Sequence, residues 1–212
     1  MMEALKAFFD SSNEVDEEEF SLFVQNAVET NKTLYAVDWV PRVTQAEREA
    51  FVLNASRIYA PRTFEIRERN EFNEVITSPL RAEHYPIYYS EPHKNNPTRA
   101  GFDLASDPER MEAMKKAAET GRAVSILQSK RLDQPGEAFN MVMLNPVFKK
   151  NEARQEQPAS SEHLLGFVIG NFHFGRIFEE IFLKIGLQGI DMMVFDATDP
   201  EREEFLYYYD PL

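Results

Sequence analysis

The chain has 212 residues, of which 43% are hydrophobic and 28% are charged, and this balance is typical of a folded domain with a sizeable core. Its formal net charge of −13 argues against nucleic acid and anionic membrane surfaces as partners, because binding to both depends on neutralisation by Lys and Arg. The chain contains no cysteine, which excludes disulfides, thiolate catalysis and cysteine-ligated metal sites.

Two helices are predicted in the first 60 residues. Apolar residues at helical spacing mark the first helix: Phe20, Phe23, Val24, Ala27 and Val28. The segment Trp39–Val43 interrupts this pattern with a proline. Thr44 and Glu47 then have the spacing of a capping box for a second helix, which Pro61 ends. We therefore expect the N-terminal part of the chain to be mainly helical.

Beyond Pro61 the pattern predicts strands that alternate with helices. One helix begins at residues 106–109 and ends at Gly121, and another covers residues 174–185 and ends at Gly186. A turn is predicted at residues 134–136 and a long loop or domain boundary at 151–162. Strands are expected over residues 63–66, 84–89, 123–127, 139–148, 164–169, 190–195 and 205–209. This order, with two α+β units after the helices, predicts an α+β fold.

Few residues have a spacing that indicates catalysis. The four histidines form no pair at metal-ligand spacing, and no glycine-rich phosphate loop is present. Asp191 and Asp196 could form a carboxylate pair of a hydrolase or bind calcium, although the residues around Asp196 also suit a turn between strands. We therefore expect no catalytic residues, no metal and no cofactor, and keep a hydrolase with this Asp pair as an alternative.

Asp103 stands out because it is an acid between two apolar residues, Phe102 and Leu104. Tyrosines precede it at positions 85, 88 and 89, so an aromatic wall and an acid occur close together in the sequence. Such an acid could anchor a donor group of a ligand in an apolar pocket. It could equally cap a turn before the helix that begins near Pro108. The spacing leaves both interpretations open.

Several ordered sequence blocks resemble the CHASE domain family. The first is Trp39–Val43, followed by Glu47 and Arg48; the central blocks are residues 85–92 with Asn96 and residues 101–110. Ala117, Gly121 and residues 145–148 follow in the same order, so the resemblance extends from about residue 20 to residue 148. Trp39, Arg42, Glu47 and Arg48 are expected to be structural residues that hold the N-terminal helices against the rest of the domain.

The resemblance implies an extracytoplasmic sensor domain, periplasmic in a bacterium, of an inner-membrane receptor. In this family the domain lies between two transmembrane helices and controls a cytoplasmic histidine kinase or a cyclic-di-GMP output module. The sequence shows no membrane span and no signal peptide, so these anchors would lie outside this chain. The implied architecture has a long N-terminal helical stalk (residues 1–60), a membrane-distal PAS-like subdomain (61–158) and a membrane-proximal PAS-like subdomain (159–212). A homodimer is expected, and this part of the receptor is not expected to be an enzyme.

The resemblance also implies a ligand site. In the plant cytokinin receptors of the family, an aspartate in the block that matches residues 101–103 binds adenine, and Asp103 is its counterpart here. These receptors use a threonine on the strand that follows the glycine matching Gly121; that stretch is 124–127 in this chain, where Ser125 could replace the threonine. An adenine-like molecule is one candidate ligand; a sensor of a protein partner or of dimerisation is the alternative. The expected pocket is lined by Tyr88, Phe102, Asp103, Ser125, Ile126, Leu127, Met141 and Met143.

Overall fold

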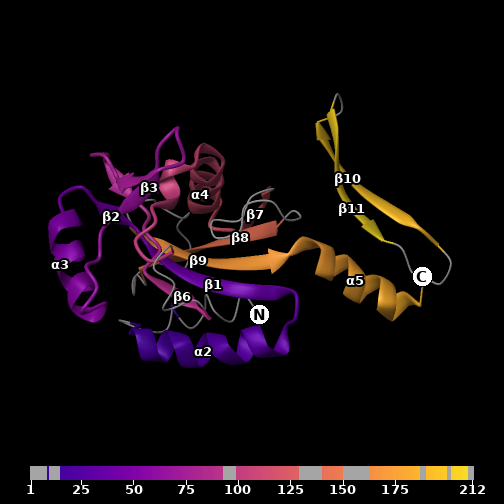
Figure 1. Ribbon diagram of the computed structural model, residues 1–212, viewed down its shortest axis with the longest axis horizontal. Coiled ribbons are helices and arrows are strands. Elements are labelled where there is room, and N and C mark those ends of the chain that lie inside the picture. Colours follow the sequence, from indigo (N-terminus) through magenta and orange to yellow (C-terminus); the bar gives the residue numbers. More distant parts are fainter. Residues whose placement is uncertain are drawn as a thin grey trace.

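A computed structural model describes Phe9 and residues 15–92, 99–128, 140–149, 163–186, 190–199 and 202–209 (Figure 1). Within these residues the protein has an α+β fold built on one antiparallel sheet of five strands. Strand β9 lies at its centre, between β1 and β8. In spatial order the strands are β6 (Tyr89–Glu91), β1 (Leu34–Pro41), β9 (Leu164–His173), β8 (Asn140–Phe148) and β7 (Val124–Gln128).

Helix α2 (Glu17–Thr30) covers one face of this sheet (Figure 1). Asp16 begins the helix, because its side chain accepts a hydrogen bond of 2.8 Å from the backbone N–H of Glu19. Phe20 and Val24 are fully buried and pack with apolar residues of β1 and β9. The space between α2 and this face of the sheet is therefore filled by one hydrophobic cluster.

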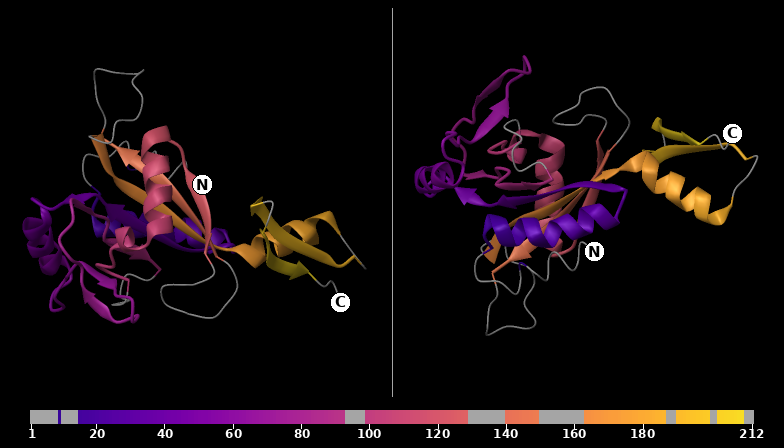
Figure 2. Two further views of the ribbon diagram at one scale, coloured as in Figure 1. Left: turned by 90° about the horizontal axis from the view of Figure 1, so that it is seen from above. Right: turned by 60° about the horizontal axis from the view of Figure 1, so that its bottom comes forward.

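Helix α4 (Pro108–Thr120) covers the opposite face (Figures 1 and 2). The side chain of Asp107 accepts from two backbone N–H groups of its first turn, and Gly121 ends it in the left-handed conformation, with φ of 66°. Its inner residues, among them Met114 and Ala117, pack on β8 and β9. The predicted boundaries of this helix are confirmed.

A smaller unit at one end of the sheet contains helix α3 (Arg48–Ile58) and two short strand pairings, β2 with β5 and β3 with β4. Arg42 and Arg48, which we expected to be structural, bind this unit: Arg42 pairs with Glu83, and Arg48 donates to the carbonyl oxygen of Ser78. The short elements are β2 (Val43–Thr44), β3 (Arg67–Arg69), β4 (Val75–Thr77), β5 (Glu83–His84) and the 3-10 helix η1 (Leu104–Ser106).

The C-terminal part projects away from the sheet (Figures 1 and 2). Helix α5 (Phe174–Ile185) follows β9 without an intervening loop and packs against a hairpin of β10 (Met192–Asp199) and β11 (Arg202–Tyr209). The ring of Phe178 stacks on that of Tyr207, with centroids 5.9 Å apart. Among the residues described, no helix is both long enough and apolar enough to cross a membrane.

The long N-terminal helical stalk expected from the resemblance is not confirmed. Among the residues that the structure describes here from Val15 onward, the two helices have 14 and 11 residues, and strand β1 separates them. The segment read as a break in the helical pattern is the end of a central strand. A strand covered on both faces has a nearly continuous apolar sequence, so it lacks the alternation that usually marks a strand.

Most of the other helices and strands expected from the sequence agree with the structure, apart from their exact ends. The strands predicted over 123–127, 139–148 and 164–169 and the helix over 174–185 are confirmed. Residues 63–66 are not a strand; β3 begins after them. The turn at 134–136 and the stretch at 151–162 lie outside the described residues. Because β1 pairs with β9, the expected segments 1–60 and 159–212 contribute neighbouring strands to one sheet.

Candidate functional site

Asp103 is completely buried, and donors of the protein itself surround its carboxylate. One of its contacts, to the backbone N–H of Ala105, caps η1, as the second interpretation of the sequence proposed. Both carboxylate oxygens are therefore occupied within the protein, and contact with a ligand stays a prediction. Oδ2 is hydrogen-bonded to His84 Nδ1 (2.7 Å), Ser78 Oγ (3.1 Å) and Arg81 Nη1 (3.3 Å). Oδ1 accepts from the backbone nitrogens of Tyr85 (2.8 Å) and Ala105 (3.1 Å).

The structure does not bring the other expected pocket residues together. Phe102 and Ile126 belong to the cluster on the α4 side of the sheet, whereas Met141 and Met143 pack on the α2 side. Successive residues of a strand point to opposite faces, and it is Val142, between the two methionines, that faces α4. Of the remaining expected residues, Tyr88 packs in the clusters around α2 and α3, Ser125 is exposed and Leu127 is half-buried.

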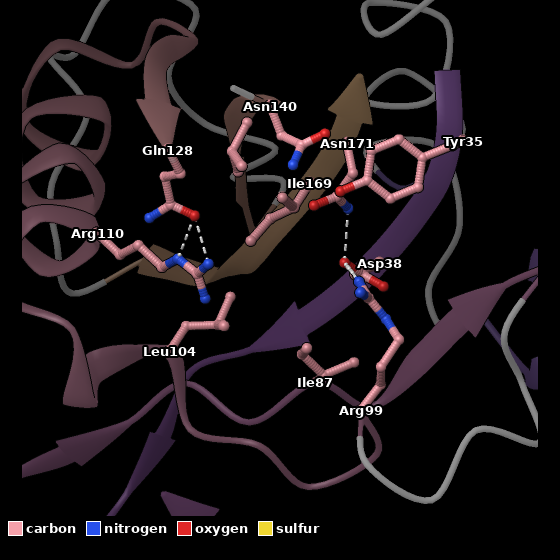
Figure 3. A pocket seen from close by; sticks show the side chains of 11 residues that line it. Tyr35, Asp38, Ile87, Arg99, Leu104, Arg110, Gln128, Asn140, Ile169 and Asn171 are labelled. Carbon is pink, nitrogen blue, oxygen red and sulfur yellow. Dashed lines mark hydrogen bonds and ion pairs between the residues drawn. The ribbon is translucent and has the colours of Figure 1, made fainter. Parts of the chain in front are cut away.

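A recess opens on the α4 side of the sheet, and we call it the sheet recess (Figure 3). It lies where strands β1, β7, β8 and β9 meet helix α4 and the chain before it. The space between its side chains, counted with the solvent at its open end, is about 370 Å³, of which about 20 Å³ is open to the centre of a water-sized molecule. Its lining residues are Tyr35, Asp38, Ile87, Arg99, Leu104, Arg110, Gln128, Asn140, Val142, Ile169 and Asn171.

One wall of the sheet recess contains a buried ion pair. Asp38 and Arg99 are each 2% exposed, and Arg99 Nη2 lies 2.5 Å from Asp38 Oδ2. The same oxygen accepts from Asn171 Nδ2 at 2.8 Å, and Asp38 Oδ1 accepts from Ser90 Oγ at 2.6 Å. A buried pair of charges is tolerated when hydrogen bonds complete it in this way. The charges of this wall therefore compensate each other.

The opposite wall contains a second buried guanidinium, that of Arg110, which is 6% exposed (Figure 3). Its Nε donates to Gln128 Oε1 at 3.0 Å, and its Nη2 donates to the same oxygen. The nearest carboxylate is that of Asp107, 3.7 Å from Nε and 36% exposed. Burial lowers the pKa of Arg110, while Asp107 acts in the opposite direction. The positive charge of Arg110 is thus held mainly by a neutral amide.

Between the two walls, Asn140 presents a donor without a partner. Its side chain is 4% exposed, and its Nδ2 makes no hydrogen bond. Figure 3 shows this nitrogen facing the space between Arg110 and Asn171. A buried donor without an acceptor costs about 1–3 kcal/mol of stability, so such groups are uncommon in proteins and call for a partner.

The Asp pair of the hydrolase alternative has a different geometry. Asp191 is exposed and directly precedes β10, and Asp196 lies within that strand. Five residues of extended chain span roughly 16 Å, whereas glycosidase carboxylates lie about 5–9.5 Å apart. In the part of the chain that the structure describes, no group of three or more His, Asp or Glu residues could hold a metal ion.

The sequence prediction missed the polar residues of the sheet recess. Asp38 lies between Val37 and Trp39 in an otherwise apolar strand, and Asn171 has a similar setting before Phe172. A polar residue inside a strand that is buried on both faces needs a partner on one of them. That signal is present in the sequence, but the prediction of a break at Trp39–Val43, which includes the end of this strand, conceals it.

Comparison with known proteins identifies the family. The CHASE domain family matches residues 13–207. The hybrid signal transduction histidine kinase A of Dictyostelium discoideum is 22% identical over 211 residues, covering 91% of this chain and 9% of that protein. The chain thus spans a small part of this relative's length. It belongs to the CHASE domain family, whose members are extracellular sensor domains of signalling receptors.

Proposed function

We propose that this chain is the ligand-sensing domain of a membrane-anchored receptor and that it binds a small molecule in the sheet recess. The observation that carries the proposal is the set of buried polar side chains in the sheet recess, one of which, Asn140, has a donor without a partner. A few polar groups converging between apolar residues are typical of small-molecule sites. Membership of a sensor family supports the same interpretation.

The receptor context is part of this proposal. The relative in Dictyostelium is a hybrid histidine kinase, which supports a kinase as the output module, and a cyclic-di-GMP enzyme is the alternative output. Flanking membrane helices outside this chain would place the domain outside the cytoplasm, at the inner membrane in a bacterium. Ligand binding would shift the population between two conformations of the receptor, to the extent that the ligand binds one of them more tightly.

A thermal-shift screen with small metabolites tests the proposal. A ligand present at a hundred times its Kd stabilises the folded state by about 2.7 kcal/mol, which raises Tm by roughly 5–10 °C for a chain of this size. Val142→Phe should abolish that shift, because Val142 lines the sheet recess and the larger ring would occupy it. Val75→Phe is the matched control, since Val75 is 52% exposed on β4. A shift that survives in Val142→Phe would refute the sheet recess as the site.

A surface feature favours the alternative of a sensor for a protein partner or for dimerisation. Helix α5 and the β10–β11 hairpin expose large apolar side chains, including those of Leu183 (72%), Ile185 (64%) and Met193 (62%). Exposed apolar groups that lie together often mark an interface. Light scattering tests this: if a homodimer forms through α5, Leu183→Glu should produce a monomer, whereas Leu80→Glu, at an equally exposed position, should not.

A further inference from the structure

We propose that the ligand of the sheet recess carries a carboxylate, which Arg110 and Asn140 bind. This inference rests on the proposed function and specifies the chemical class of the ligand. It depends on two properties of the sheet recess: its charge and the hydrogen-bonding groups that remain unused.

The charge of the sheet recess is positive on the side of α4. Its lining contains three ionised side chains, and two of them, Asp38 and Arg99, neutralise each other in direct contact. The third, Arg110, has no carboxylate within hydrogen-bonding distance, since that of Asp107 lies 3.7 Å away and partly in solvent. A buried cation held mainly by an amide is favourable for an anion that enters beside it.

The unused hydrogen-bonding groups also favour an acceptor. Asn140 Nδ2 has no partner, and Arg110 Nη1 makes no hydrogen bond to any described residue. Three acceptor oxygens of the lining are occupied: both carboxylate oxygens of Asp38 accept from donors, and Gln128 Oε1 accepts from Arg110. A carboxylate has only acceptors, and guanidinium groups bind it with short, charge-assisted hydrogen bonds.

The size of the sheet recess limits the ligand. Only about 20 Å³ of it is open to the centre of a water-sized molecule, which is room for one or two water-sized groups, and the figure of about 370 Å³ includes solvent at the open end. Apolar side chains of Ile87, Leu104 and Ile169 line the remainder. The ligand is therefore a small organic acid whose apolar part contacts these three residues.

Matched acids and amides test the inference directly. Acetate with acetamide, pyruvate with pyruvamide and benzoate with benzamide differ in charge but hardly in size, and adenine serves as a neutral reference. Each is titrated into the ¹⁵N-labelled chain while the side-chain amide resonances of Asn140 and Gln128 are followed by NMR. At least one acid should shift both resonances and bind about tenfold or more tightly than its amide.

Variants then locate the charge that recognises the acid. Arg110→Gln should remove the preference for the acid, and Arg110→Lys should restore part of it. Arg122→Gln removes an equal charge at an exposed position just after α4 and should leave the preference unchanged. If Arg110→Gln does not fold, Asn140→Asp provides the test, because it places a negative charge at the free donor without changing its size. It should make the amide bind better than the acid.

The outcomes separate this inference from the proposed function. If amides or adenine shift the Asn140 resonance as strongly as the acids do, the carboxylate is refuted while a sensor that uses the sheet recess stands. If none of the acids shifts that resonance, the carboxylate is refuted as well, and the Val142→Phe thermal-shift experiment decides the sensor separately. An acid preference that persists in Arg110→Gln would exclude Arg110 as its cause.

Discussion

Replacing Asp103 by Asn should destabilise the fold strongly, even though the side chain keeps its size. Asp103 is 0% exposed, and five donors of the protein point at its oxygens. An amide puts an NH₂ group where one oxygen accepted, so at least one donor then faces another donor. A hydrogen bond to a charged group contributes about 1.5–3 kcal/mol and a buried donor left without an acceptor costs about 1–3 kcal/mol, so we expect a total loss of about 3–5 kcal/mol. The part due to Arg81 is small, because that side chain is 27% exposed and screened by water.

Urea denaturation measures this cost. With an m-value of about 2 kcal/mol/M, a loss of about 3–5 kcal/mol moves the midpoint down by roughly 1.5–2.5 M. Asp16→Asn is the control, because Asp16 is an exposed N-cap and Asn caps helices as well as Asp does. Its midpoint should stay within about 0.3 M of the wild type.

A stable Asp103→Asn protein would refute this reasoning. If its midpoint stays within about 0.5 M of the wild type at an unchanged m-value, the donors around Asp103 do not hold the fold together. If that stable variant also loses the thermal shift caused by a ligand, the result supports the ligand contact predicted from the family resemblance. The same variant therefore distinguishes a structural role of Asp103 from a binding role.

Three further predictions concern other parts of the molecule. Arg42 lowers the pKa of Glu83 through their hydrogen bond. This pair therefore stabilises the fold above the unfolded-state pKa of Glu83, and the stabilisation is lost as the pH falls through the folded-state pKa. Glu83→Gln should flatten the pH dependence of Tm below about pH 5. Gly166→Ala should cost about 3 kcal/mol or more in urea denaturation, because its Cβ would lie 2.3 Å from a backbone oxygen of β1. Gly175→Ala places a Cβ 2.9 Å from the ring of Tyr207. It should speed amide hydrogen exchange in β10 and β11, whereas the urea midpoint at which the five-stranded sheet unfolds should change little.

The sequence predicted those elements whose ends carry a local signal. Asp107 and Pro108 begin α4 and Gly121 ends it, and each acts through the backbone of its own turn. No such signal marks β1. This strand is stabilised by α2 on one face of the sheet, by α4 on the other face and by its neighbour β9, which is remote in the chain. Local pattern alone therefore could not reveal this interior strand.

The candidate site was harder to predict because its position depends on strand register. A shift of one residue exchanges the two faces of a strand, and the sequence around Met141 is apolar on both faces. The expected pocket therefore included Met141 and Met143, whereas Val142 lines the sheet recess. The blocks that carry the family resemblance identified the family correctly, but they did not include Asp38 or Asn171, which come from β1 and β9.

The direct passage from β9 into α5 gives the sheet recess a mechanical connection to the C-terminal unit. Asn171 lines the sheet recess, and α5 begins three residues later, at Phe174. A helix of 12 residues is about 18 Å long, so a tilt of β9 by about 5° would move the far end of α5 by about 1.5 Å. With no loop at the junction to absorb the rotation, a small adjustment around a bound molecule would become a larger displacement at Ile185. The chain thus connects the lining of the sheet recess directly to the helix of the C-terminal unit.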